Sequence, residues 1–184
     1  TAYHRHTDKL FYSAFGKRHA NWGPLGPNGI YVTTSAKSTS TTSNTTSFVN
    51  LNSINPAFDA GNPTRNFNPG LGDKTQPNYD ENMFTKVGIT GMGDLDVSED
   101  GKYLYTINLN DRKAWRIEIG QNAIAPTSAS QIVAYTSFPN PCTNSTFRPF
   151  AIKSYKGEIY VGGVCDGVTD LSNPSSAVDR NNLK

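Results

Sequence analysis

Alternating apolar and polar positions predict β-strands in the middle of the chain. In GMGDLDVSEDGKYLYTINLNDRKAWRIEI, residues 91–119, a period-two alternation continues on both sides of Asp100-Gly101. An Asp-Gly pair suits a type I′ turn, in which both central residues have positive φ. A third strand follows, in which Trp115, Ile117 and Ile119 alternate with charged residues. The pattern therefore predicts a three-stranded antiparallel meander.

This meander needs a partner, because a lone three-stranded sheet of this size is marginally stable in water. Its apolar face must be covered by another part of the fold. We therefore expect Tyr105 and Trp115 to pack between the meander and neighbouring sheets.

The same pattern recurs along the chain. GKYLYTINLND, residues 101–111, matches GEIYVGGVCD, residues 157–166, and DKLFYSAFGKRH, residues 8–19, offers a third run of charge, aromatic strand and basic loop. Repeats of about 40 to 55 residues, each with a few antiparallel strands, are typical of β-propeller blades.

The sequence thus predicts an all-β fold, a partial β-propeller of about three blades of antiparallel meanders with long loops. The blades are expected at residues 9–52, 93–137 and 148–184, with a long loop rich in Asn, Pro and Gly at residues 55–84. Propellers close with about four to eight blades, so three cannot form a ring. We expect one flank to meet the remainder of the same propeller or another protein chain.

Composition narrows the choice of partner. The 184 residues are 35% hydrophobic and have a mean hydropathy of -0.54, which suits short strands joined by polar loops. The formal net charge is only +2, so the sequence shows no strongly basic surface of the kind that binds nucleic acid, and no nucleic-acid partner is expected. No apolar run is long enough to predict a membrane span.

Two cysteines, Cys142 and Cys165, lie on either side of the hairpin predicted for the third blade. We expect a disulfide bond between them; the alternative is a pair of buried free thiols in a cytosolic protein. The disulfide is favoured because a polar, Lys-poor surface rich in Thr and Asn suits an oxidising compartment, in which such bonds persist.

Three segments together resemble a known group of proteins. FYSAFGKRHANWGPLGPNGIYV, residues 11–32, residues 91–119, and CTNSTFRPFAIKSYKGEIYVGGVCDG, residues 142–167, are similar to a propeller-like region of very large secreted surface proteins of Bacteroidetes-type bacteria. Those proteins often carry serine-aspartate-repeat B-like modules. The resemblance implies cell-surface export and a non-enzymatic role in adhesion, scaffolding or surface and filament assembly, with a surface glycan or a protein as ligand. It brings no catalytic residues.

The alternative function is a divalent-metal-dependent propeller hydrolase or lyase of the gluconolactonase type, which the DLDVSEDGKYLY pattern also resembles. Asp94 and Asp96 lie on the first strand of the second predicted blade, and first strands line the central channel of a propeller. Their carboxylates are candidate ligands for a hard cation such as Ca²⁺, which needs several oxygen ligands. The third blade offers Phe150 and Ile152 in the corresponding stretch, which favours a structural role for the two aspartates.

The loop KRHANWGPLGPNG, residues 17–29, is a candidate recognition surface. Trp22 stands among Gly-Pro pairs, close to Arg18 and His19, so it could be a rigid aromatic that stacks on a ligand or anchors an interface. The alternative is that Trp22 folds over the blade edge as packing.

Overall fold

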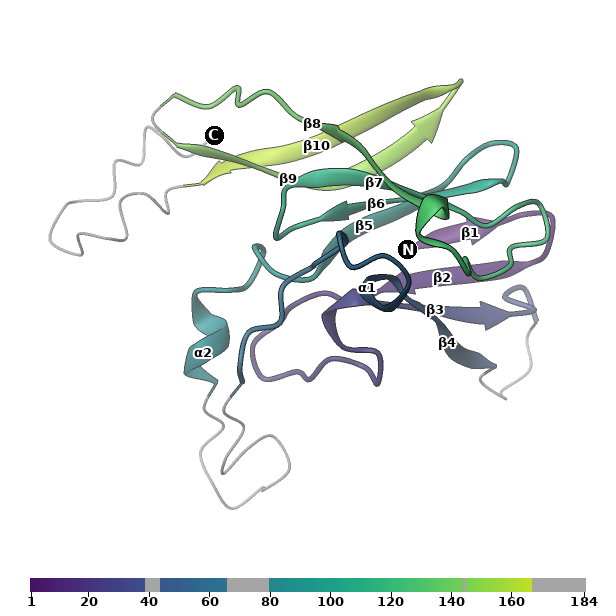
Figure 1. Cartoon of the computed structure of the whole chain (residues 1–184), viewed down its shortest axis with the longest axis horizontal. Helices are drawn as coiled ribbons and strands as arrows, with labels where there is room; N and C mark the ends of the chain where they lie inside the picture. The colour runs from purple at the N-terminus through teal and green to yellow at the C-terminus, as the bar shows by residue number, and fades with distance from the viewer. Residues whose placement is uncertain (39–43, 66–79, 144, 167–184) are drawn as a thin grey trace, which may run out of the picture.

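The computed structural model describes residues 1–38, 44–65, 80–143 and 145–166. These residues form an all-β protein with three antiparallel sheets, none closed on itself (Figure 1). The strands of the first sheet, in spatial order, are β1 (Ala2–His4), β2 (Lys9–Ser13), β3 (Gly29–Thr34) and β4 (Thr45–Asn50). Those of the second are β5 (Met92–Val97), β6 (Tyr103–Asn108), β7 (Lys113–Glu118) and β8 (Ile132–Ser137). Those of the third are β9 (Thr146–Tyr155) and β10 (Glu158–Asp166).

In the part of the chain that the structure describes, helical structure is confined to single turns. They are α1 (Leu51–Ile54), α2 (Glu81–Phe84) and the 3-10 turns η1 (Gly26–Asn28) and η2 (Ala129–Gln131). No helix in the described ranges is long and apolar enough to cross a bilayer. The prediction of an all-β fold is therefore confirmed.

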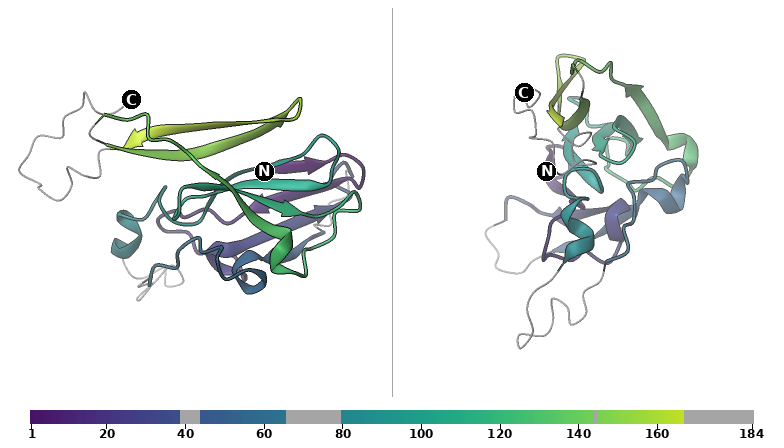
Figure 2. Two further views of the ribbon diagram at one scale, coloured as in Figure 1. Left: turned by 45° about the horizontal axis from the view of Figure 1, so that its top comes forward. Right: turned by 90° about the vertical axis from the view of Figure 1, so that its left-hand side faces the viewer.

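The second sheet lies between the other two (Figure 2). Its first strand, β5, contacts β1 and β2 on one side and β9 on the other. The first strands of neighbouring sheets thus lie side by side, and within each sheet the strands follow one another in chain order from that first strand.

One apolar core lies between the first and second sheets. Phe11 and Ile30 of the first sheet and Leu95 and Trp115 of the second are almost fully buried there. Phe58, from the segment after α1, packs edge-on against Trp115 with ring centroids 5.1 Å apart. The described parts of residues 55–84 contain no strand, as expected, but this segment contributes to the core.

A second apolar core lies between the second and third sheets. Tyr105, Ile107 and Leu109 pack there with Ile152 of β9. Successive residues of a strand point to opposite faces, so one sheet can serve two cores. The prediction that Trp115 and Tyr105 pack between sheets is confirmed: Trp115 faces the first sheet and Tyr105 the third.

The turn after β5 corrects one prediction. Gly101 has a φ of 76°, but Asp100 is not among the residues with positive φ, so the turn is not type I′. The Asp100 carboxylate accepts a hydrogen bond from the Ser98 hydroxyl at 2.7 Å, and the Gly101 amide donates to the Ser98 carbonyl at 2.9 Å, which stabilises a longer loop. Positive φ at both central residues occurs instead at Lys156-Gly157, with values of 50° and 79°.

The second sheet runs from Met92 to Ser137, and the second blade is predicted at residues 93–137; that this sheet is a propeller blade stays a prediction. The predicted beginning at Lys9 misses β1, because three residues are too few to show a period-two pattern. The third sheet is described as far as Asp166, so the rest of the predicted third blade, residues 167–184, lies outside the described residues.

The predicted disulfide bond is confirmed. Cys142, in the loop before β9, is bonded to Cys165 in β10, with Cα atoms 5.6 Å apart. The bond therefore links the loop between β8 and β9 to β10, an edge strand of the third sheet.

Candidate functional site

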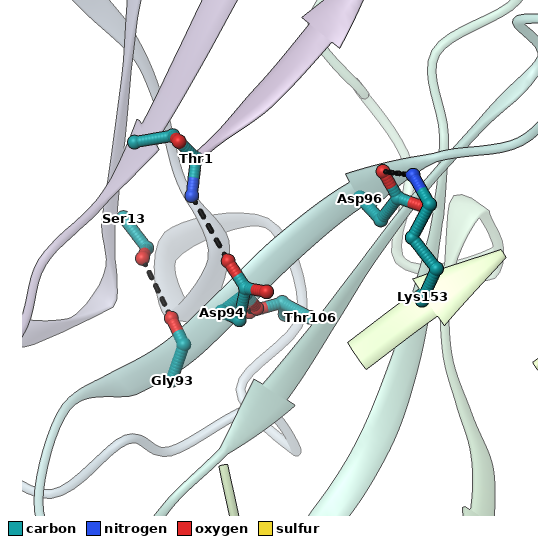
Figure 3. A network of polar contacts seen from close by, with 7 residues as sticks. All are labelled: Thr1, Ser13, Gly93, Asp94, Asp96, Thr106 and Lys153. Atoms are coloured by element: carbon teal, nitrogen blue, oxygen red, sulfur yellow. Dashed lines mark hydrogen bonds and ion pairs between the residues drawn. The ribbon is translucent and has the colours of Figure 1, made fainter. Parts of the chain in front are cut away.

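The candidate metal ligands Asp94 and Asp96 form a polar network on β5 (Figure 3). The backbone nitrogen of Thr1 lies 3.0 Å from Asp94 Oδ1. Lys153 Nζ lies 3.1 Å from Asp96 Oδ1, and the Ser154 amide donates to Asp96 Oδ2 at 2.7 Å. The two carboxylates therefore point to different sheets, Asp94 to the first and Asp96 to the third.

Backbone groups of β5 extend this network. The Ser13 hydroxyl donates to the Gly93 carbonyl at 2.9 Å, and the Thr106 hydroxyl donates to the Asp94 carbonyl at 3.1 Å. A Cβ atom at Gly93 would lie 2.5 Å from the Phe150 carbonyl oxygen, so glycine permits the close approach of β9. These contacts connect all three sheets through β5.

The described residues do not bring other metal-binding groups to the two aspartates. Within residues 1–38, 44–65, 80–143 and 145–166, no three His, Cys, Asp or Glu side chains form a group that could hold a metal ion. Both Asp96 oxygens already accept hydrogen bonds, from Lys153 and Ser154. A cation at Asp96 would have to displace the Lys153 ammonium.

A groove of about 470 Å³ lies beside Asp96, where the turn after β1, the turn after β5 and the end of β9 meet. Small-ligand sites commonly have volumes of about 300 to 1,000 Å³. Its lining includes Tyr3, Arg5, His6, Asp96, Glu99, Lys153 and Tyr155. Sequence reasoning missed this groove, because its side chains come from three distant segments and form no contiguous motif.

The loop at residues 17–29, predicted as a recognition surface, makes contacts with other parts of the same protein. The Arg18 guanidinium lies 5.2 Å from the centroid of the Phe84 ring, and the His19 amide donates to Asp80 Oδ2 at 2.9 Å. Trp22 is half-buried and packs against the core between the first and second sheets. Trp22 and His19 share neighbours, because Arg65 lies 5.8 Å from the centroid of the Trp22 ring and pairs with the same Asp80 that binds the His19 amide.

A buried ion pair fixes this loop. Arg65 pairs with Asp80, and both side chains are almost fully buried. Arg65 also donates to the carbonyls of Ala20 at 2.6 Å and Lys17 at 3.0 Å. Burial alone would raise the pKa of the Asp80 carboxyl, but hydrogen bonds from Arg65 and from the His19 amide outweigh it and lower that pKa. This geometry fits the packing interpretation of Trp22, and binding of a partner there stays a prediction.

Comparison with known proteins finds one similar region. No protein-family model matches the chain, and no solved structure matches it. The chain is similar to Colossin-D of Dictyostelium discoideum, with 30% identity over 166 residues. The matched region is 89% of this chain but 16% of Colossin-D, so the chain spans only a small part of the length of that relative. The similarity therefore carries no activity, substrate or partner of the whole relative over to this chain.

Proposed function

We propose that the chain is a non-enzymatic extracellular module, part of a β-propeller that serves adhesion, scaffolding or filament assembly in a large secreted surface protein. The observation that supports it most is the placement of β5 between β1 and β9, with the strands of each sheet in chain order from its first strand. Blades of a propeller are arranged in this way around a central channel.

The hydrogen bonds and ion pairs of the Asp94 and Asp96 carboxylates support a structural rather than a catalytic role for these two residues. Asp94 and Asp96 are on β5, the first strand of the second sheet, where they bond to Thr1, beside the first sheet, and to Lys153 and Ser154 of the third. Their contacts stabilise the arrangement of the sheets.

The disulfide bond between Cys142 and Cys165 supports the extracellular location, because such bonds persist in oxidising compartments. A rigid framework with polar grooves at its loop ends suits binding by loop chemistry, with a surface glycan or protein as partner. The groove beside Asp96 is the first place to look for that contact.

A competition experiment tests this function. Cells that display the natural protein are placed on the substratum to which they normally adhere. Their attachment is measured with and without the 184-residue chain added in solution. We expect the soluble chain to inhibit attachment, and Arg5→Ala with Glu99→Ala in the groove to weaken the inhibition several-fold. Val133→Ala, on the far strand β8, is the matched control.

Two results would contradict the proposal. One is attachment that depends on the natural protein but is unaffected by the soluble chain. The other is a stoichiometric divalent cation together with lactone hydrolysis that is lost in Asp94→Asn or Asp96→Asn, which would establish the metal-dependent enzyme instead.

A further inference from the structure

The two described strands of the third sheet, β9 and β10, correspond to the first two strands of the second sheet, β5 and β6. Val97 pairs with Leu104 beside the turn of the second sheet, and Ser154 pairs with Ile159 beside the turn of the third. Leu104 belongs to the core between the first and second sheets, and Ile159 packs against the core between the second and third sheets. Each residue thus faces the sheet that comes before its own in the chain. The pairing therefore aligns β6 with β10 in structure as well as in sequence.

This alignment identifies the residues of β10 that face away from the second sheet. In β6 and the residue after it, Tyr105, Ile107 and Leu109 are buried because the third sheet covers them. The residues at the corresponding positions of β10 are Tyr160, Gly162 and Val164. We call these three residues the open face.

The open face has no comparable cover among the described residues. Tyr160 is 52% exposed and Val164 is 58% exposed, whereas Tyr105 is 9% and Leu109 is 1% exposed. A Cβ atom at Gly162 would meet only the Ala151 methyl group, at 3.5 Å.

A shallow hollow lies on this side of the third sheet. Its volume is about 560 Å³, and its lining is mostly apolar: Pro149, Phe150, Ala151 and the run from Gly162 to Val164. Phe150 is 42% exposed and extends the apolar surface towards Phe15, whose ring centroid lies 5.5 Å away. Soluble proteins rarely leave large contiguous apolar surfaces uncovered, so this one is suited to docking.

We propose that the open face binds a further antiparallel sheet of the same repeat, supplied by the same polypeptide. This inference rests on the proposed propeller function and names the contact that continues it. The corresponding face of the second sheet indicates which side chains such a partner would place on the open face. That face is covered by the aliphatic residues Ile152, Ile159 and Val161, from the first two strands of the third sheet. A strand pair with aliphatic side chains at these positions is thus the partner of the open face.

The details of the face fit this occupant. Gly162 stands where β6 has Ile107, so the incoming sheet can place a larger side chain opposite it. The similar protein Colossin-D extends far beyond the matched region, which gives a related polypeptide ample length for further repeats.

Hydroxyl-radical footprinting tests the contact. The oxidation rate of Tyr160 is measured in the 184-residue chain and in the natural full-length protein. We expect a several-fold lower rate in the full-length protein. Tyr135 on β8 is the internal control, because it is 50% exposed and lies outside the open face, so its rate should be similar in both.

A variant gives a second readout. Tyr160→Glu should leave the proteolytic resistance of the 184-residue chain unchanged, since the side chain is exposed there, and should accelerate proteolysis of the full-length protein several-fold. Ile124→Glu, at a loop position that is 64% exposed and outside the open face, should change neither. Equal Tyr160 oxidation in the two proteins would overturn the inference.

The identity of the occupant is tested separately. Dimers of the 184-residue chain with Tyr160 protected would show that a second copy is the occupant and would overturn the choice of the same polypeptide. A full-length structure with a helix on the open face would also overturn it. The attachment experiment does not depend on either result, so failure of the docking contact and failure of the proposed function can be told apart.

Discussion

His4 Nε2 lies 2.9 Å from the carbonyl oxygen of Gly101, although the two residues are 97 positions apart in the chain. The His4 side chain is fully buried at the end of β1, and its Nδ1 lies 2.8 Å from the Thr7 hydroxyl. A buried polar group that loses its partner costs about 1 to 3 kcal/mol. This contact therefore holds the turns after β1 and β5 together beside the polar groove.

Gly101→Ala should destabilise the protein more than Gly157→Ala. Both glycines have positive φ, 76° and 79°, so alanine introduces similar backbone strain of about 1 to 2 kcal/mol at each. Only at Gly101 would the new Cβ also lie 2.9 Å from His4 Nε2; at Gly157 nothing lies within 4 Å. We expect an additional loss of about 1 to 3 kcal/mol for Gly101→Ala, measured by urea denaturation. Equal losses would show that the contact with His4 relaxes at no cost.

Trp115→Ala should lower the free energy of unfolding by about 3 to 5 kcal/mol, because it removes a large side chain from the core between the first and second sheets. It also leaves the Asp111 carboxylate without the indole N–H that donates to it at 2.9 Å. Ile124→Ala is the control, since this side chain in the loop after β7 is 64% exposed and its removal should change stability by less than about 0.5 kcal/mol. A loss below about 1 kcal/mol for Trp115→Ala would contradict the burial of this ring.

Asp111 should give stability a specific pH dependence. Burial is the main cause that raises the pKa of its carboxyl, against opposing hydrogen bonds from Trp115 and the Lys113 amide. The folded state then holds the proton more tightly than the unfolded state, in which the pKa is about 3.9. The contribution of Asp111 to stability therefore falls as the pH rises from about 3.9 through the raised folded value.

The measurement compares the protein with Asp111→Asn in urea unfolding at several pH values. The free energy of unfolding of the natural sequence should fall relative to that of the variant as the pH rises through this window. Asp100→Asn is the matched control with the opposite sign, because hydrogen bonds from the Ser98 hydroxyl and the Lys102 amide lower the pKa of Asp100. A pH-independent difference for Asp111→Asn would contradict the effect of burial.

Removal of the disulfide should destabilise the third sheet. Cys142 and Cys165 are separated by 23 positions, and closing a loop of this size contributes about 2 to 4 kcal/mol. The double variant Cys142→Ser, Cys165→Ser should show this loss in urea denaturation and should no longer respond to a reducing agent. An unchanged urea midpoint would indicate that the third sheet unfolds independently of the measured transition.

Much of the fold is readable from short-range pattern. The alternation in residues 91–119 is sufficient for the first three strands of the second sheet, and the similarity around Tyr105 and Tyr160 is sufficient for the repeat between the second and third sheets. The placement of Cys142 and Cys165 is sufficient for the disulfide. The strand and repeat signals depend on neighbouring residues in a regular backbone, so they can be recognised without knowledge of the rest of the chain. The disulfide signal depends on the hairpin between the two cysteines, which brings positions 23 residues apart together.

Other features depend on contacts between distant segments. In the sequence, Asp94 and Asp96 are possible cation ligands. In the structure, Lys153 and the Ser154 amide bind the Asp96 carboxylate instead. The pairing of His4 with Gly101 and the groove next to it have no local signature, because their residues come from different sheets. Such relationships arise from how the sheets pack, and the packing energy is summed over the whole core rather than encoded in any one segment.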